Sequence, residues 1–219
     1  MKKVIIAIVC CMVSVMSYGQ LRWGIEAGAN ISHALETNKT KAGFNIGARA
    51  DYSLSSLLYL DATLKLSSQP CGYDNTNYYV DKPESGSRVV ANFTPYYLTL
   101  PVRIGLNFKL NKYLKTYVAA GPMIGVGLFG KGDTKHYANV SSSGEGTLTG
   151  SAKLDNVFKN TFDGCFSTSR FEYGANINLG LEFMSHYRLG FEYSIIHIPG
   201  DVKAVDNMNI YSISLGYVF

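Results

Sequence analysis

Phe171-Glu-Tyr-Gly-Ala-Asn-Ile-Asn-Leu-Gly-Leu-Glu-Phe183 alternates apolar or aromatic side chains with glycines, amides and carboxylates along its whole length. Successive side chains of a β-strand point to opposite faces of a sheet, so this period of two predicts a strand. One face would be aromatic and aliphatic. The other would carry Glu172, Asn176, Asn178 and Glu182 between glycines. The stretch therefore predicts a strand that meets an apolar medium on one face and a polar medium on the other.

The same period recurs on both sides of this stretch, and we expect eight strands. Their ranges are Arg22–Ser32, Lys41–Tyr52, Leu57–Ser68, Ala91–Lys109, Leu114–Phe129, Ser169–Met184, Tyr187–Ile198 and a last segment that ends at Phe219. Each reaches the roughly 9–11 residues that a tilted strand needs to cross a bilayer, and eight is the smallest usual number for a membrane barrel. We therefore predict an all-β fold: an eight-stranded, antiparallel, up-and-down transmembrane β-barrel over residues 20–219.

The links between these segments alternate in length. Those at 53–56, 110–113 and 185–186 are short, and those at 33–40, 69–90, 130–168 and 199–207 are long. Outer-membrane barrels have short turns on the periplasmic side and long loops outside. The alternation predicts an outer-membrane protein, in contact with lipid, whose two termini both lie in the periplasm.

The polar face of the segments holds glycines beside charged residues, whereas aromatic residues gather near the ends of the apolar face. A soluble barrel would hide the apolar face inside, but aromatic rims are typical of the two membrane interfaces. We expect a network of charges in the barrel interior, formed by Glu26, Arg49, Asp51, Asp61, Lys65, Arg103, Lys109, Lys115, Glu172, Glu182, Arg188 and Glu192. Because side chains can fill an eight-stranded barrel, a packed interior is favoured over a pore.

The first nineteen residues have the pattern of a secretory signal peptide. A positive Met1–Lys3 precedes the apolar run Val4–Val15, and the small residues near Gly19 mark a cleavage point. The apolar run is too short for a membrane-spanning helix. Without Lys2 and Lys3 the 20 basic side chains become 18 against 16 acidic ones, a net charge of +2 that offers no footprint for nucleic acid.

Three blocks resemble the PorT-like outer-membrane β-barrel family of Gram-negative bacteria. They are Tyr97-Leu-Thr-Leu-Pro-Val-Arg-Ile-Gly105, Ala120-Gly-Pro-Met-Ile-Gly-Val-Gly127 and Tyr173-Gly-Ala-Asn-Ile-Asn-Leu-Gly180. The resemblance implies an eight-stranded outer-membrane barrel, and its name-giving member belongs to a protein-secretion apparatus. The aromatic ending with Tyr217 and Phe219 also resembles the signal through which barrel-assembly machinery recognises its substrates. No catalytic residues come with this resemblance.

The long links are the predicted working surface. The link at 69–90 is rich in aromatic and amide residues suited to recognition of a protein or glycan: Tyr73, Asn75, Asn77, Tyr78 and Tyr79. The centre of the next long link, Ser141–Ser151, has a composition typical of flexible segments. Cys71 and Cys165 lie in links on the same side of the membrane and are candidates for a disulfide, with two free thiols as the alternative.

No motif for chemistry is convincing in this sequence. Gly125-Val-Gly-Leu-Phe-Gly130 matches a dinucleotide loop but lies in a predicted strand without a following helix. The four histidines have no metal-ligand spacing, and we expect no metal site and no cofactor. The sequence predicts a structural scaffold or partner-binding protein, and the family resemblance implies a connection with secretion. A surface adhesin that acts through its loops, and a loop-borne enzyme using His197 and Asp201, are the alternatives.

Overall fold

The computed structural model describes residues 21–34, 39–79, 82–141, 144–158, 169–199 and 207–219, which form ten strands in one antiparallel sheet. The strands are β1 (Leu21–Ala34), β2 (Lys39–Ser53), β3 (Leu58–Ser68), β4 (Cys71–Tyr79), β5 (Lys82–Lys109), β6 (Leu114–Val140), β7 (Thr147–Leu154), β8 (Phe171–Phe183), β9 (Tyr187–His197) and β10 (Asn207–Val218). The predicted all-β, antiparallel architecture is confirmed. Within these ranges no helix is long and apolar enough to cross a membrane. The predicted signal peptide, Cys165 and Asp201 lie outside the described residues.

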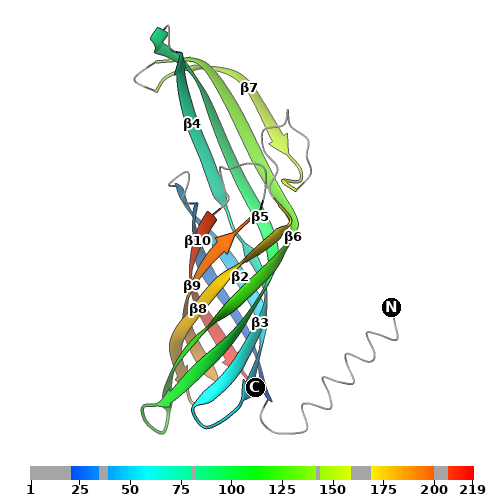
Figure 1. The fold of residues 1–219 in the computed structure, drawn as a ribbon, viewed down its shortest axis with the longest axis vertical. Coiled ribbons are helices and arrows are strands. Elements are labelled where there is room, and N and C mark those ends of the chain that lie inside the picture. Colours follow the sequence, from blue (N-terminus) through cyan, green and yellow to red (C-terminus); the bar gives the residue numbers. More distant parts are fainter. Residues whose placement is uncertain (1–20, 35–38, 80–81, 142–143, 159–168, 200–206) are drawn as a thin grey trace, which may run out of the picture.

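Eight of the described strands close into a ring, in the order β1-β2-β3-β5-β6-β8-β9-β10 and back to β1 (Figure 1). The first and last barrel strands pair over most of their length, from Gly24 opposite Val218 to Ala34 opposite Met208. Closure satisfies the backbone N–H and C=O groups that an open sheet edge would leave unpaired in lipid.

The two faces of the ring differ as the alternation predicts. Aliphatic side chains point outward and are exposed, with Leu215 at 68% and Ile104 at 60%, whereas the Arg103 side chain points inward and is fully buried. Aromatic groups lie at both ends of the outer face. Tyr96 stacks on Phe129 at the end where β5 and β6 continue upward, and Tyr187 packs against Tyr217 at the end with the short turns. An apolar belt between aromatic rims is the surface expected for a protein embedded in a bilayer.

A four-stranded sheet projects from one end of the barrel, where the sequence predicted only loops. The upper halves of β5 and β6 pair with each other as far as Gly86 and Val140, and β4 and β7 flank them (Figure 1). The expectation of loops at 69–90 and 130–168 is therefore wrong for these parts, and β7 occupies much of the stretch that was expected to be flexible. The period of two was harder to detect here because neither face meets lipid, so polar residues occur on both faces.

Two prolines and a bulge lie where this projecting sheet meets the barrel. β4 pairs with β5 directly beyond the end of β3, after an interruption at Gln69 and Pro70. The backbone amide of Gln69 donates to the carbonyl of the second proline, Pro95, at 3.0 Å. The pairing of β5 with β6 shifts register between Tyr96 and Tyr97. Tyr96 lies opposite Phe129 and Tyr97 lies opposite Gly127, so β6 carries one extra residue here. Proline cannot donate to the sheet ladder, and bulges bend strands. The projecting sheet accordingly leans to one side of the barrel axis (Figure 1).

Glycines inside the barrel make room for large neighbours on the adjacent strand. Tyr59 lies opposite Gly105, and Tyr117 lies opposite Gly180. A Cβ atom added at Gly105 would overlap the Tyr59 ring, and one added at Gly180 would overlap the Tyr117 phenol and the neighbouring backbone. On the inner face, glycines thus lie beside large side chains on the neighbouring strands. This arrangement leaves room for long side chains inside a narrow barrel.

We predict that Gly105→Val destabilises the barrel by about 1–3 kcal/mol or more, because the added side chain overpacks the interior against Tyr59. Urea titration in detergent would measure the loss. Gly150→Val is the matched control, since a Cβ atom at Gly150 meets nothing within 4 Å, and it should stay within about 0.5 kcal/mol. If Tyr59→Ala did not relieve part of the Gly105→Val defect, this packing explanation would be wrong.

Candidate functional site

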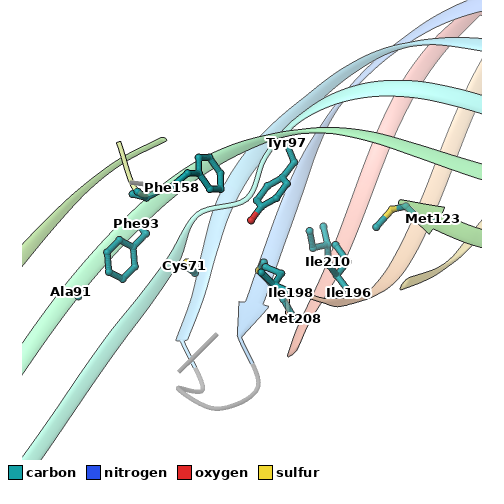
Figure 2. Close-up of a cluster of buried hydrophobic side chains, with 11 residues drawn as sticks. Cys71, Ala91, Phe93, Tyr97, Met123, Phe158, Ile196, Ile198, Met208 and Ile210 are labelled. Atoms are coloured by element: carbon teal, nitrogen blue, oxygen red, sulfur yellow. The ribbon is translucent and has the colours of Figure 1, made fainter. Parts of the chain in front are cut away.

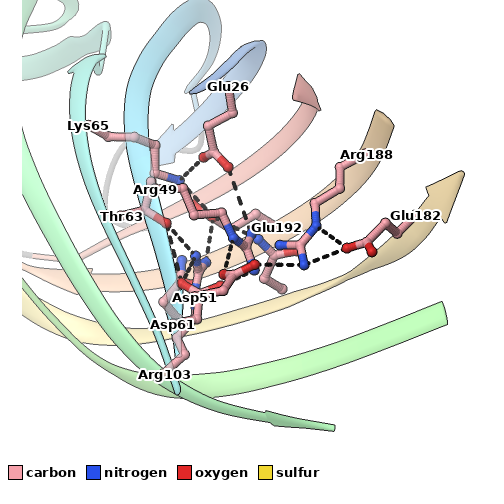
Figure 3. Close-up of polar contacts among 12 residues, drawn as sticks. Glu26, Arg49, Asp51, Asp61, Thr63, Lys65, Arg103, Glu182, Arg188 and Glu192 are labelled. Atoms are coloured by element: carbon pink, nitrogen blue, oxygen red, sulfur yellow. Dashed lines mark hydrogen bonds and ion pairs between the residues drawn. The ribbon is translucent and has the colours of Figure 1, made fainter. Parts of the chain in front are cut away.

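The centre of the barrel interior is built around Arg103, which is completely buried (Figure 3). Its Nη2 atom lies 2.7 Å from Asp61 Oδ1, and its Nη1 atom lies 2.9 Å from Glu192 Oε2. The same guanidinium donates to Asn176 Oδ1 at 2.7 Å and to the Thr63 hydroxyl at 2.9 Å. One arginine thus joins strands β3, β5, β8 and β9 across the lumen.

Two further cations surround this centre. Lys65 Nζ lies 2.6 Å from Glu192 Oε2 and 3.6 Å from Glu26 Oε1. Arg49 donates from Nε to Asp51 Oδ1 at 2.7 Å and also pairs with Asp61. These carboxylates are shared between cations, so the contacts form a connected network rather than separate pairs (Figure 3).

The end of the lumen near the short turns is organised by Glu182. This carboxylate accepts from Arg22 at 2.9 Å, from Lys115 at 2.9 Å and from Arg188 at 2.8 Å. The Tyr117 ring lies close to two guanidinium groups, with its centroid 4.8 Å from Arg188 and 5.5 Å from Arg49. Arg22 and Lys115 are about a quarter exposed, so the network reaches the solvent at this end.

The structure brings together most, but not all, of the predicted interior charges. Lys109 lies exposed at the end of β5, and no ion pair of this lysine is found within the described part of the chain. Glu172 is fully buried but lies apart from the cations. Its Oε1 atom accepts a hydrogen bond from the side-chain amide of Gln69 at 3.1 Å. Arg22 was missed, although it shares its strand face with Glu26 and could have been found from the period of two.

An apolar cluster fills the other end of the lumen (Figure 2). Phe158 packs edge-on against Tyr97 with ring centroids 5.5 Å apart, and the Tyr97 hydroxyl donates to the Ser169 carbonyl at 2.9 Å. Around them lie Cys71, Ala91, Phe93, Met123, Val157, Ile196, Ile198, Met208 and Ile210. The segment after β7 places Val157 and Phe158 over the barrel, since the Val157 amide donates to the Gly130 carbonyl at 3.1 Å.

Cys71 carries a buried free thiol in the described part of the chain, and burial raises its pKa to about 12. Because the thiolate is the reactive form, we predict that a Cys165→Ser variant in its folded state reacts with a maleimide at pH 8 at least about tenfold more slowly than after unfolding. Labelling followed by mass spectrometry measures both rates. Equal rates in the two states would show that Cys71 is accessible.

The outward face of the projecting sheet carries a row of residues that runs across its four strands. Thr76 lies opposite Arg88, Arg88 opposite Tyr137, and Tyr137 opposite Leu148. Arg88 Nη2 lies 2.7 Å from Asp74 Oδ2, and this hydrogen-bonded ion pair raises the pKa of the arginine. Tyr78 and Leu148 are about half exposed, at 46% and 53%. We name Thr76, Tyr78, Arg88, Tyr137 and Leu148 the tip row.

The predicted recognition residues are not one loop patch. Tyr73, Asn75, Asn77, Tyr78 and Tyr79 all belong to the strand β4 rather than to a loop. Tyr78 shares its face with Arg88, whereas Asn75 and Asn77 occupy positions on the opposite face. Arg88, Tyr137 and Leu148 were missed because they are far from Tyr78 in sequence and only strand pairing brings them together.

The four histidines are separated from one another, and the rings of three contact a neighbouring link or strand. His33 Nδ1 lies 3.0 Å from the Thr40 hydroxyl, His186 Nδ1 lies 2.8 Å from the Val218 carbonyl, and His197 Nδ1 lies 3.0 Å from Asn207 Oδ1. Gly125 and Gly130 of the G-x-G-x-x-G match lie inside β6. Among the residues that the structure describes, no three His, Cys, Asp or Glu side chains are placed to hold a metal ion.

The carboxy-terminal residues take part in closing the barrel. Tyr217 stacks on His186 with centroids 5.5 Å apart, and the Phe219 amide donates to the Trp23 carbonyl at 2.7 Å. The last strand thus seals the seam with β1 and presents its aromatic end at the turn side of the outer face.

Comparisons with known proteins give several distant similarities. Solved structures that this chain resembles include Ail, the attachment invasion locus protein of Yersinia pestis, determined with the heparin analogue sucrose octasulfate, with 16% identity over 91% of this chain and 99% of that chain and a TM-score of 0.42. They also include Neisserial surface protein A, with 14% identity over 90% and 95% of the two chains and a TM-score of 0.39. The outer membrane enzyme PagL has 12% identity over 87% and 97% and a TM-score of 0.33.

A comparison with curated proteins finds no match. The family model described as outer membrane protein beta-barrel domain matches residues 4–219, nearly the whole sequence. Together with the closed ring and its exposed apolar belt, that match shows that the chain belongs to the outer membrane protein β-barrel domain family.

Proposed function

We propose that this protein is a recognition protein of the outer membrane, in which the barrel is the anchor and the projecting sheet is the binding part. The tip row is the observation that supports this role most directly. It combines two tyrosines and an arginine, residue types that are enriched at the energetic centres of interfaces, with an exposed leucine on a sheet held by backbone pairing. Asp74 holds the Arg88 guanidinium in place, which lowers the entropy that binding would cost.

The length of the projecting sheet also suits an anchored binder. Residues 82–94 of β5 span roughly 40 Å at about 3.3 Å per residue.

In the proposed orientation this sheet lies outside the cell, and the short turns and both termini lie in the periplasm. Residues 1–19 are removed on export, and the barrel-assembly machinery recognises the last strand through Tyr217 and Phe219. Membership of the PorT-like branch and a role without catalysis are parts of the same proposal.

The test is photocrosslinking in living cells with a photoreactive amino acid at Tyr137. The expected result is an adduct between this position and an external protein or glycan, lost when Arg88→Glu is introduced. Leu215 in the apolar belt is the matched control and should give lipid adducts only. Adducts found solely from Lys112, in the short turn after β5, and solely with periplasmic secretion proteins would instead support a secretion scaffold.

A protein of this design should not conduct ions. The Arg103 network and the apolar cluster occupy the lumen one above the other, so we expect no single-channel steps from the purified protein in a planar bilayer. A known porin measured in the same bilayer is the positive control. Reproducible current steps from this protein would contradict the packed interior.

A further inference from the structure

Between the charge network and the apolar cluster lies a small cavity of about 10 Å³, which is room for one water molecule. Lys65 and Glu192 line it on the side of the network, and Met123, Ile196 and Ile210 line it on the side of the apolar cluster. The remaining wall is polar and includes Asn45, Ser67, Gln69 and Thr99. These polar groups on part of the wall distinguish this cavity from the wholly apolar voids that stay dry in proteins.

Two amide side chains that line this cavity have unused hydrogen-bonding atoms. Asn45 is 4% exposed, and neither its Nδ2 nor its Oδ1 atom has a hydrogen-bond partner among the described residues. Gln69 is 1% exposed, and its Nε2 atom donates to Glu172 while its Oε1 atom is unused. Buried amides rarely lack partners, because leaving them unpaired costs much of their hydration.

We infer that this cavity is a binding site for a single structural water molecule that bridges Asn45 and Gln69. A water molecule can donate to the Gln69 Oε1 and Asn45 Oδ1 atoms and accept from a donor at the same site, which satisfies the groups that the protein leaves unpaired. A cation would fit less well, since the Lys65 ammonium also lines the cavity.

The bridge would also explain how Glu172 is tolerated in the upper lumen. Its only described hydrogen bond comes from Gln69, so the position of the Gln69 amide decides whether the carboxyl has a partner. A water molecule held by Asn45 would donate to the Gln69 Oε1 atom and so fix the orientation of the Gln69 side-chain amide. The bound water would therefore connect β2 to β8 through Gln69, above the part of the lumen where Arg103 joins the strands.

The experiment uses the complete mature protein in detergent micelles and water itself as the probe. Cross-relaxation between water and the Asn45 side-chain amide is expected. Asn176 is the matched control: it is equally buried, but its Oδ1 atom accepts from Arg103 and its Nδ2 atom donates to Ser194, so it should show no such transfer. Asn45→Leu should abolish the transfer from water to the Gln69 side-chain amide, which remains in this variant as a reporter, and should lower the melting temperature less than Asn176→Leu, which breaks two hydrogen bonds.

A crystal structure at high resolution gives a second, independent result. An electron-density peak within hydrogen-bonding distance of both Asn45 and Gln69, absent in Asn45→Leu, is the expected outcome. An Asn45 side chain that instead bonds directly to Ser67 or Lys65, or transfer from water to Asn176 as strong as to Asn45, would overturn the proposal.

Discussion

Replacement of Arg103 by methionine is expected to destabilise the barrel by about 3–5 kcal/mol, the typical cost of removing one partner from a buried ion pair. Methionine keeps an unbranched apolar stem but lacks the guanidinium, so the main loss is the charge and the hydrogen bonds that it donates to Asp61, Glu192, Asn176 and Thr63. Asp61 and Glu192 would each lose a direct cationic partner inside the lumen. Urea-induced unfolding in lipid vesicles measures the change, and Trp23 is a convenient fluorescent reporter because it is the single tryptophan.

The control for Arg103→Met removes the charge from both sides of one contact. Adding Asp61→Asn to Arg103→Met should recover part of the lost stability, because one of the two carboxylates that lost Arg103 as a partner is then neutral. Lys109→Met is a second control: this lysine is exposed at the end of β5, so its removal should change stability by less than about 0.5 kcal/mol. A loss for Arg103→Met no larger than that for Lys109→Met would show that the network contributes little to stability.

Leu179→Arg is expected to cost about 2–4 kcal/mol, because it places a charge on the outer face near the middle of the hydrocarbon layer. Leu179 is 51% exposed on β8, between Phe171 and Phe183 at the two aromatic rims. In water such a substitution on an exposed site would change almost nothing. The sign and size of the effect therefore report directly whether lipid covers this face.

Phe183→Arg provides the depth control for that measurement. It introduces the same charge on the same strand face but at the rim, where the cost should fall to about 0–1 kcal/mol. Parallel urea titrations of both variants in vesicles give the difference. Equal costs at the two positions would contradict the proposed depth of the strand in the membrane.

The barrel could be predicted from the sequence because a membrane imposes a strict pattern on every strand that crosses it. Lipid on one face and a narrow polar lumen on the other make the period of two visible from Trp23 to Phe219. Outside the membrane this constraint ends, and β4 and β7 carry polar residues on both faces, so they look like loops in the sequence. Their pairing with β5 and β6 depends on contacts between distant segments.

The interior shows a similar boundary between what the sequence reveals and what only the fold reveals. The face on which Arg103 lies follows from its strand, but its partners Asp61 and Glu192 come from β3 and β9, and the register of three strands decides that they meet. Glu172 lies on the same strand face as the other interior acids, yet its hydrogen-bond donor is the side-chain amide of Gln69 rather than a cation. Position along the barrel axis, which the alternation does not encode, makes that difference.

β5 and β6 run without interruption from the short turn at one end of the barrel to the upper part of the projecting sheet, as strands of 28 and 27 residues. No linker separates the barrel from the projecting sheet. A ligand that pulls on the sheet would therefore load the ladder between these two strands lengthwise, with many hydrogen bonds sharing the force at once. Attachment under shear flow is the mechanical situation to which such a continuous pair of strands is suited.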